Sequence, residues 1–164
     1  MKKEVKKCIF AGTFDPPTLG HKAVIDTCLK MFDEVVVAIM INPAKQPYFT
    51  LEDREKMLAL TCNDSRVRVV ATAGTVAELL EKENTKFYVR GIRNSIDLDY
   101  ENANFYASKK LDSDLTAVYL PCPQELLHVS SSIVRNSLKF NTPIDEYVTK
   151  EVKEYIIKNT NKGE

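Results

Sequence analysis

The chain has 164 residues, with 23 Lys+Arg against 23 Asp+Glu, and it is 44% hydrophobic and 28% charged. This length corresponds to about one domain, so we expect residues 1–164 to form a single domain. The apolar fraction is too high for a disordered chain. The balanced charge argues against a nucleic-acid backbone as the main partner, since such proteins carry a basic surplus. It does not exclude a small anionic ligand, which needs only a local cluster of cations.

The N-terminus and the cysteines indicate an intracellular protein. The basic start MKKEVKK precedes an apolar run that is too short for a signal peptide. No stretch approaches the ~18 apolar residues of a membrane span. The cysteines lack the spacing of a zinc site, so we expect them to be reduced and mostly buried: Cys8, Cys28, Cys62 and Cys122. We therefore expect a cytoplasmic protein with no membrane partner.

Short β-branched segments alternate along the chain with longer segments of helical spacing. The predicted strands are Cys8–Ala11, Glu34–Ile41, Val67–Ala71, Lys86–Val89 and Ala117–Leu120. Near-continuous apolar strands that alternate with helices are typical of a parallel sheet with both faces covered. We predict an α/β fold, a five-stranded parallel doubly wound Rossmann-like sheet with helices on both faces and a helical C-terminal tail. Ligands of such folds bind beyond the carboxyl ends of the strands.

Capping residues and apolar spacing predict the helices. Thr18 is expected to cap one helix, and Thr50 another that ends near Thr61. Further helices are predicted over Val76–Glu83, about Ile96–Leu111 and Ser130–Phe140. The helical tail, about 142–160, is predicted to begin at Thr142-Pro143, because proline suits the first helical position.

The segment after the first strand, GTFDPPTLGH, has features of an anion site. Gly12 is expected to let the backbone turn sharply. With Thr18 as the cap, Gly20 and His21 fall in the first helical turn, where free N–H groups and the helix dipole favour phosphate. The segment is neither a G-x-G-x-x-G nor a Walker A loop. On spacing alone, a tight turn with an incidental histidine explains it equally well.

The ends of the later strands also carry groups that suit anionic oxygens. Lys45 lies between two prolines, although a solvated loop lysine is the commoner case. Arg90 and Arg93 flank a glycine, and arginine forks bind phosphate bidentately. Glu101 either contacts a ligand or belongs to an acidic helix start. Three serines, 130–132, follow the last strand, and capping explains only one of them. This convergence predicts one anion-binding site at the end of the sheet.

Three segments in this order, GTFDPPTLGH, RGIRNSIDLDYE and VSSSIVR, resemble the motifs of bacterial phosphopantetheine adenylyltransferases. The first is a form of the (H/T)-x-G-H signature, which alone would assign only the nucleotidylyltransferase superfamily. The resemblance extends from Ile9 to the last helix. It implies the reaction ATP + 4′-phosphopantetheine → 3′-dephospho-coenzyme A + pyrophosphate, with Mg²⁺ as cofactor and no covalent intermediate. It also implies a homohexamer, and it leaves feedback binding of coenzyme A open.

The resemblance further implies a role for individual residues. The catalytic residues would be His21, Lys45 and Arg93. The phosphopantetheine site would comprise Thr13, Lys45, Val76 and Arg90. The ATP site would comprise Thr13, Phe14, His21, Gly91, Ile92, Arg93, Glu101, Leu126, Leu127, His128, Val129, Ser130, Ser131 and Ser132. No protein ligand to a metal is implied.

The chain departs from the family pattern in two places. The family often has an aromatic residue near Leu126, and its loop near Gly74-Thr75 varies. Neither departure removes a charged group.

Two alternative functions are left open. One is a nucleotidylyltransferase for another acceptor, such as nicotinate mononucleotide or glycerol 3-phosphate, and the other is a nucleotide-binding module without catalysis. The first should lack the combination of RGIR…DYE with SSSIVR, and the second gains no support while the charged groups are all present.

Overall fold

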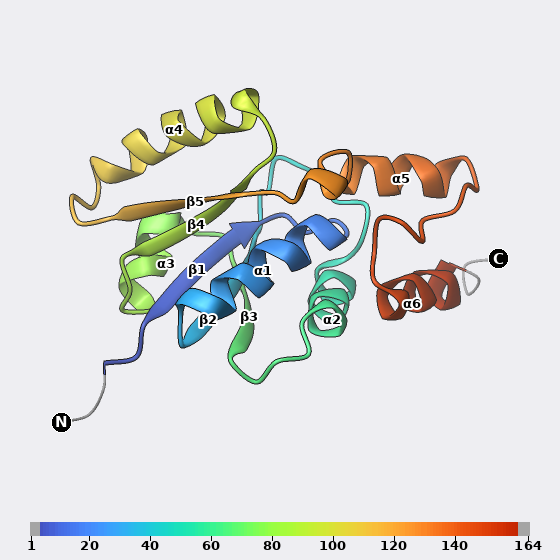
Figure 1. Ribbon diagram of the computed structural model, residues 1–164, viewed down its shortest axis with the longest axis horizontal. Coiled ribbons are helices and arrows are strands. Elements are labelled where there is room, and N and C mark those ends of the chain that lie inside the picture. Colours follow the sequence, from blue (N-terminus) through green and yellow to red (C-terminus); the bar gives the residue numbers. More distant parts are fainter. Residues whose placement is uncertain (1–3, 161–164) are drawn as a thin grey trace.

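The computed structural model describes residues 4–160, which form a five-stranded sheet and its covering helices (Figure 1). The strands are β1 (Lys7–Gly12), β2 (Glu34–Met40), β3 (Val67–Thr72), β4 (Phe87–Ile92) and β5 (Thr116–Pro121). Every neighbouring pair is parallel, and the strand order is β3-β2-β1-β4-β5. The prediction of a five-stranded parallel sheet is confirmed, because each strand overlaps its predicted segment.

The helices are α1 (Leu19–Met31), α2 (Leu51–Thr61), α3 (Val76–Lys82), α4 (Ser95–Lys109), α5 (Ser131–Lys139) and α6 (Lys150–Thr160). A short 3₁₀ helix, η1 (Gln124–Leu126), precedes α5. The predicted caps Thr18 and Thr50, and Ser130 from the group of three serines, each accept a hydrogen bond from the backbone N–H three residues further on. Local capping therefore sets where these three helices begin.

Two buried clusters fill the two faces of the sheet, as expected for a doubly wound fold. One cluster joins alternate residues of β1 and β2 to α1 and α2, including Phe10, Val37, Ile25 and Leu58. The other takes the intervening strand residues, such as Ile9 and Val36, and packs them against α3, with Phe105 of α4 added. Strand order reverses between β1 and β4, so a crevice is expected there, beyond the carboxyl ends of the strands.

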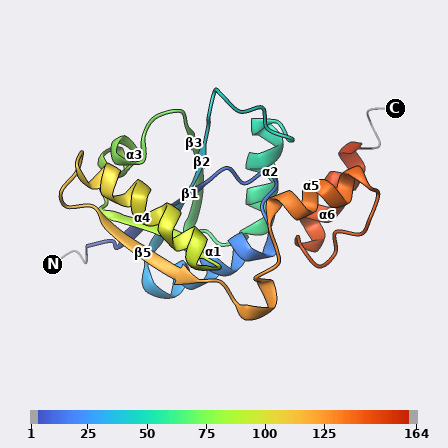
Figure 2. The same ribbon diagram turned by 90° about the horizontal axis from the view of Figure 1, so that it is seen from above.

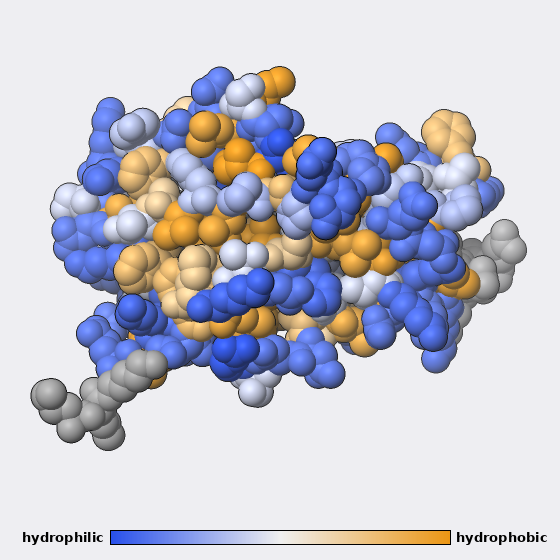
Figure 3. Space-filling model, viewed as in Figure 1, coloured by the Kyte–Doolittle hydropathy of each residue, from blue (hydrophilic) through white to orange (hydrophobic). Residues whose placement is uncertain are grey.

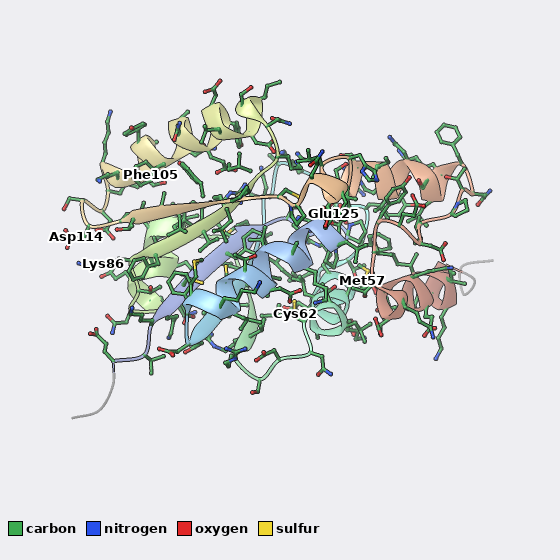
Figure 4. The ribbon with its side chains drawn as sticks, in the orientation of Figure 1. Met57, Cys62, Lys86, Phe105, Asp114 and Glu125 are labelled. Atoms are coloured by element: carbon green, nitrogen blue, oxygen red, sulfur yellow. The ribbon has the colours of Figure 1, made fainter. Side chains whose placement is uncertain are left out.

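A third buried cluster lies beyond the carboxyl ends of the strands. It combines Met57 of α2 and Val134 of α5 with Val152 and Ile156 of α6. Figures 1 and 2 both show α5 and α6 side by side, beyond the end towards which β1 points. Met57 extends from α2 towards this group in Figure 4. The predicted helical tail therefore packs on α2 and α5 of its own chain.

The tail begins as extended chain and turns, so the predicted helix start at Thr142-Pro143 is wrong. No helix is assigned over residues 141–149, and α6 starts at Lys150. The Thr142 N–H donates to Ser137 O (2.9 Å), which closes the end of α5. Further along, Tyr147 O accepts from the Leu19 N–H (2.8 Å). These contacts of the backbone with α5 and α1 replace the intrahelical bonds that the sequence pattern suggested.

The cysteines are all free thiols, of which Cys8 and Cys28 are fully buried and Cys62 and Cys122 partly buried. A hydrogen bond with Cys28, together with burial, raises the pKa of the Cys8 thiol. None of the helices within residues 4–160 combines the length and apolar character needed to cross a membrane.

Candidate active site

A cavity of about 1080 Å³ opens at the carboxyl ends of β1, β2 and β4. Its walls come from the β1–α1 loop, the β2–α2 loop, the β4–α4 segment and the N-terminus of α5. Among the residues expected to bind ligands, the cavity brings together Thr13, Phe14, His21, Lys45, Arg90, Gly91, Arg93, Glu101, Val129, Ser130, Ser131 and Ser132. The predicted convergence of strand ends on one site is therefore present in the geometry.

The β1–α1 loop turns at Phe14 rather than at Gly12. Phe14 has φ 50°, whereas no described glycine has a positive φ. A Cβ on Gly12 would lie 3.1 Å from the Phe14 ring, which is tighter than ordinary van der Waals contact. The structure thus overturns the expected role of Gly12: its missing side chain makes room for the ring. Phe14 is buried, and it belongs to the residues that line the cavity.

Side chains from α2 and α5 hold the carbonyl groups of this loop. Arg54 Nη1 donates to Thr13 O (3.1 Å), and Arg135 Nη1 donates to Asp15 O (2.6 Å). Ser131 Oγ donates to Pro16 O (2.8 Å). The loop is therefore fixed by helices that pack on the third buried cluster, far along the chain from the loop itself.

The carboxylate of Asp15 connects two loops of the site. It is 6% exposed and accepts the N–H groups of Tyr48 and Phe49, both at 2.8 Å. These residues end the β2–α2 loop, which also carries Lys45. Lys45 itself is exposed and lines the cavity. Asp15 therefore fixes one end of the segment that carries Lys45 relative to the turn before His21.

His21 is held as a neutral imidazole. Its Nδ1 accepts the Thr18 N–H (3.0 Å), while Thr18 Oγ1 accepts the His21 N–H (3.4 Å). Burial lowers the pKa of His21 to about 4, and the charges of Arg90 and Arg93 add to this effect. Because Nδ1 is an acceptor, the ring proton is on Nε2. His21 can thus donate a hydrogen bond without carrying a charge.

The first turn of α1 offers fewer free N–H groups than its sequence suggests. Leu19 N–H is taken by Tyr147 O, and His21 N–H by its cap Thr18. Within the described chain, Gly20 N–H has no hydrogen-bond partner, and Gly20 lines the cavity. A single backbone donor therefore remains at this helix start for an anion.

Arg90 enters the cavity wall as one member of a buried ion pair. Its Nη1 donates to Ala11 O and its Nη2 to Glu101 Oε1, and Glu101 is 6% exposed. Its Nε is buried with no hydrogen-bond partner in the part of the chain described. The guanidinium lies over the Tyr88 ring, 5.9 Å from the centroid. The ion pair and the ring fix the direction of the arginine fork.

Arg93 also pairs with a carboxylate. Its Nε and backbone N–H both donate to Asp97 Oδ2 at 3.0 Å. The hydrogen bond from Arg93 holds the pKa of Asp97 below its ordinary value. The glycine between the two arginines is required by packing, because a Cβ on Gly91 would lie 2.8 Å from Val24 Cγ2.

The three serines have three different roles. Ser130 caps α5 by accepting the Ile133 N–H (3.2 Å), and Ser131 holds Pro16 O. Ser132 Oγ accepts from Arg135 Nη2 (3.1 Å). All three line the cavity at the start of α5, so this helix N-terminus and its hydroxyls face the space where a ligand would lie.

Five of the expected ligand-binding residues lie outside the cavity wall: Val76, Ile92, Leu126, Leu127 and His128. Val76 packs against the buried cluster under α3. His128 is exposed, and its ring is 6.1 Å from that of Tyr147, edge to face. Leu126 and Leu127 belong to the 3₁₀ turn before α5.

Several cavity residues were not predicted from the sequence, chiefly Arg54 of α2 and, from α5, Arg135 and Lys139. Among residues 4–160, Arg54 and Arg135 have no carboxylate within ion-pair distance, unlike Arg90 and Arg93. An uncompensated positive charge in a cavity attracts anions. Of these residues, only Arg135 lies in a segment that the sequence analysis singled out, as the last residue of VSSSIVR.

Comparisons with known proteins agree on one family. The cytidylyltransferase-like family model matches residues 9–137. A phosphopantetheine adenylyltransferase of Thermotoga neapolitana is 36% identical, over 94% of this chain and 97% of that protein. The same enzyme of Flavobacterium johnsoniae is 38% identical, over 82% of this chain and 89% of that protein.

Solved structures agree on the fold. A Vibrio parahaemolyticus structure assigned as a nicotinate-nucleotide adenylyltransferase has a TM-score of 0.75 and 27% identity, covering 94% of this chain and 93% of that one. The Plasmodium falciparum nicotinic acid mononucleotide adenylyltransferase, at 19% identity, covers 96% of each chain with a TM-score of 0.70 and shows the fold alone. Taken with the three motifs that meet in the cavity, the matches over most of the sequence place this chain in the phosphopantetheine adenylyltransferase family of cytidylyltransferase-like proteins.

Proposed function

We propose that the protein transfers the adenylyl group of ATP to 4′-phosphopantetheine, giving 3′-dephospho-coenzyme A and pyrophosphate. A phosphate oxygen of the acceptor forms a bond to the α-phosphorus, and the bond from the α-phosphorus to the bridging β-phosphate oxygen breaks. The observation that carries this proposal is the cavity that joins the three family motifs. Relatives at 35–38% identity bear this enzyme's name. For the alternative acceptor, nicotinate mononucleotide, the support is a structural neighbour at 27% identity.

Catalysis in this proposal consists of positioning and charge stabilisation. His21 Nε2–H donates to an oxygen of the α-phosphate, where negative charge grows in the transition state. Its fixed tautomer supports this role, since Nδ1 is occupied by Thr18 N–H. Lys45 supplies a mobile positive charge from the exposed loop, and Arg93 binds the phosphates of ATP from the opposite wall.

Thr13 and Arg90 bind the phosphate of the acceptor in this scheme, with Lys45 close by. Val76 was expected to contact the pantetheine arm, but this partly buried residue at the start of α3 packs against the second buried cluster and lies outside the cavity wall. We place the arm against Met40 and Ile41 instead, since these apolar side chains line the cavity at the end of β2.

ATP occupies the part of the cavity formed by the β4–α4 segment and the start of α5. Gly91, Arg93 and Glu101 form one side, and Val129 and the three serines form the other. Ile92, Leu126, Leu127 and His128, which the family resemblance also assigns to ATP, lie outside the cavity wall. Phe14 lines the cavity next to Thr13.

Mg²⁺ is part of the proposal, carried on the phosphates of the nucleotide. The described residues contain no group of three or more His, Cys, Asp or Glu side chains suited to a metal ion. The carboxylates that line the cavity already bind other groups. Asp15 accepts backbone N–H groups, and Asp97 and Glu101 each pair with an arginine. These residues fit a cation held mainly by phosphate oxygens and water, as Mg²⁺ commonly is. When bound, Mg²⁺ neutralises phosphate charge.

We also propose a homohexamer and feedback binding of coenzyme A in the same cavity. Figure 3 shows apolar side chains on the surface over α4. Ile96 (77% exposed) and Tyr106 (64% exposed) of α4 are apolar side chains of the kind that subunit contacts cover. Light scattering tests the oligomer, and competition between coenzyme A and ATP tests the feedback site.

The decisive experiment offers ATP and Mg²⁺ with a panel of acceptors and follows pyrophosphate release. We expect release with 4′-phosphopantetheine and none with nicotinate mononucleotide, glycerol 3-phosphate or pantetheine. Release with nicotinate mononucleotide alone would assign the alternative function. No release with any acceptor, together with ATP binding, would indicate a non-catalytic module.

A further inference from the structure

Arg54 is a buried arginine in the cavity wall that no motif predicts. It belongs to α2 and is 4% exposed. Its Nη1 donates to Thr13 O (3.1 Å) and its Nε to Thr50 O (3.4 Å). Its other amino group, Nη2, makes no hydrogen bond within residues 4–160. One edge of the guanidinium is thus held by backbone, and one donor group is left over.

The charge of Arg54 is also uncompensated in the described chain. Other arginines form ion pairs with carboxylates: Arg66, Arg68, Arg90 and Arg93. The carboxylate of the same loop, Asp15, already binds the N–H groups of Tyr48 and Phe49. Burying a guanidinium without a counter-charge is unfavourable. Such a group is better explained by an anion that binds next to it than by stability alone.

We propose that Arg54 is an anion-binding residue of the cavity, with Nη1 fixed on Thr13 O and Nη2 bound to a phosphoryl oxygen of the ligand. Both the arginine and Thr13 line the cavity, so one phosphoryl group can meet the threonine and the guanidinium together. The inference rests on the proposed function for the identity of the phosphorylated ligand. The phosphoryl group comes either from 4′-phosphopantetheine or from the triphosphate of ATP.

Two variants separate anion binding from a purely structural role. Arg54→Gln keeps an N–H donor for Thr13 O but loses the charge and the second donor. Arg54→Lys keeps the charge. A structural role predicts that Gln is tolerated at least as well as Lys, whereas anion binding predicts the reverse. Arg66→Gln is the matched control, because Arg66 is exposed and pairs with Asp64 away from the cavity.

Titration calorimetry with inorganic pyrophosphate provides the first test. We expect Arg54→Gln to bind pyrophosphate about ten- to a hundredfold more weakly than the unaltered protein. Arg54→Lys should recover most of this loss, and Arg66→Gln should bind normally. Equal binding by the unaltered protein and Arg54→Gln would overturn the proposal. It would also be overturned if the unaltered protein bound none of the three ligands pyrophosphate, 4′-phosphopantetheine and ATP.

Paired ligands then identify the source of the phosphoryl group. If the source is the acceptor, Arg54→Gln weakens 4′-phosphopantetheine and leaves pantetheine unchanged. If the source is ATP, it weakens ATP and leaves adenosine unchanged. An equal loss for phosphorylated and unphosphorylated ligands contradicts the proposal. Failure of the unaltered protein to bind 4′-phosphopantetheine would refute the proposed function, while the pyrophosphate titration would still test Arg54.

A structure of the unaltered protein with pyrophosphate provides a test that needs no variant to fold. We expect a pyrophosphate oxygen within hydrogen-bond distance of Arg54 Nη2. Pyrophosphate bound in the cavity away from Arg54 would exclude the role.

Discussion

The backbone N–H of Thr18 donates to Nδ1 of His21 at 3.0 Å, and this contact determines which form of the histidine the fold accepts. A protonated imidazole has no acceptor at Nδ1, so it would lose the bond. Burial and two neighbouring arginines act in the same direction and lower the pKa of His21 to about 4.

We expect the free energy of unfolding to depend on pH through His21. The unfolded pKa is about 6.5 and the folded pKa is about 4, so the unfolded chain binds more protons between these values. The contribution of neutral His21 is present above pH 6.5 and is lost as pH falls towards 4, by at most about 3 kcal/mol. Denaturant unfolding between pH 4 and 7 measures this dependence. The slope of the free energy of unfolding against pH should be smaller for His21→Gln than for the unaltered protein. His128→Gln serves as the control, and the same slope in all three would contradict the prediction.

His21→Ala is expected to lower kcat much more than it weakens ATP binding. The Nε2–H bond to the α-phosphate strengthens only as charge develops, so its loss raises the barrier. Removing one such donor lowers rates by about 10²–10³-fold in comparable sites. Steady-state kinetics with calorimetry of ATP binding makes the comparison. An unchanged kcat would show that His21 only caps α1.

Arg90→Lys should impair the protein although it keeps the positive charge. The guanidinium binds Ala11 O and Glu101 at once, and a lysine ammonium cannot reproduce that planar fork. We expect KM for the phosphorylated acceptor to rise about tenfold or more, with KM for ATP little changed. An unaltered acceptor KM would remove Arg90 from the acceptor site. Lys86→Arg is a suitable control, since Lys86 pairs with Asp114 at the other end of the sheet (Figure 4).

Tyr155→Phe tests how the tail supports the site. Tyr155 Oη donates to Asp53 Oδ1 (2.7 Å), which joins α6 to the first turn of α2. The hydrogen bond from Thr50 has the largest effect in lowering the pKa of Asp53, and the hydrogen bond from Tyr155 has the next largest. Losing one bond to a partly exposed carboxylate should lower the free energy of unfolding by about 1 kcal/mol. Kcat should stay the same, because the variant touches no cavity residue; thermal denaturation and kinetics together check both parts.

The local features of the fold were readable from sequence, because each depends on near neighbours. Thr18, Thr50 and Ser130 cap helices through N–H groups three residues away. The strand ends placed Thr13, His21 and Arg93 on one cavity because parallel strands end at the same edge. The tail was also predicted to be helical, and Val152 and Ile156, four residues apart, bury one face of α6.

The remaining features depend on contacts between distant parts of the chain. Arg54 sits in a helix rich in charged residues, and nothing local shows that its partner is Thr13 O. Arg135 likewise reaches Asp15 O across most of the sequence. Thr142-Pro143 has a good helix-start pattern, but the Thr142 N–H is bound by Ser137 O instead. Tertiary hydrogen bonds here outweigh a weak local preference.

The bond from Leu19 N–H to Tyr147 O has a consequence for how the protein matures. α1 carries His21 near the N-terminus, yet the first amide of this helix is satisfied by Tyr147, a residue that is synthesised much later. During translation the sheet and α1 can therefore assemble before the helix start is complete. Competence to bind ligands should arise late, once the segment around Tyr147 has left the ribosome, and a nascent chain ending before it would carry the motifs without the finished site.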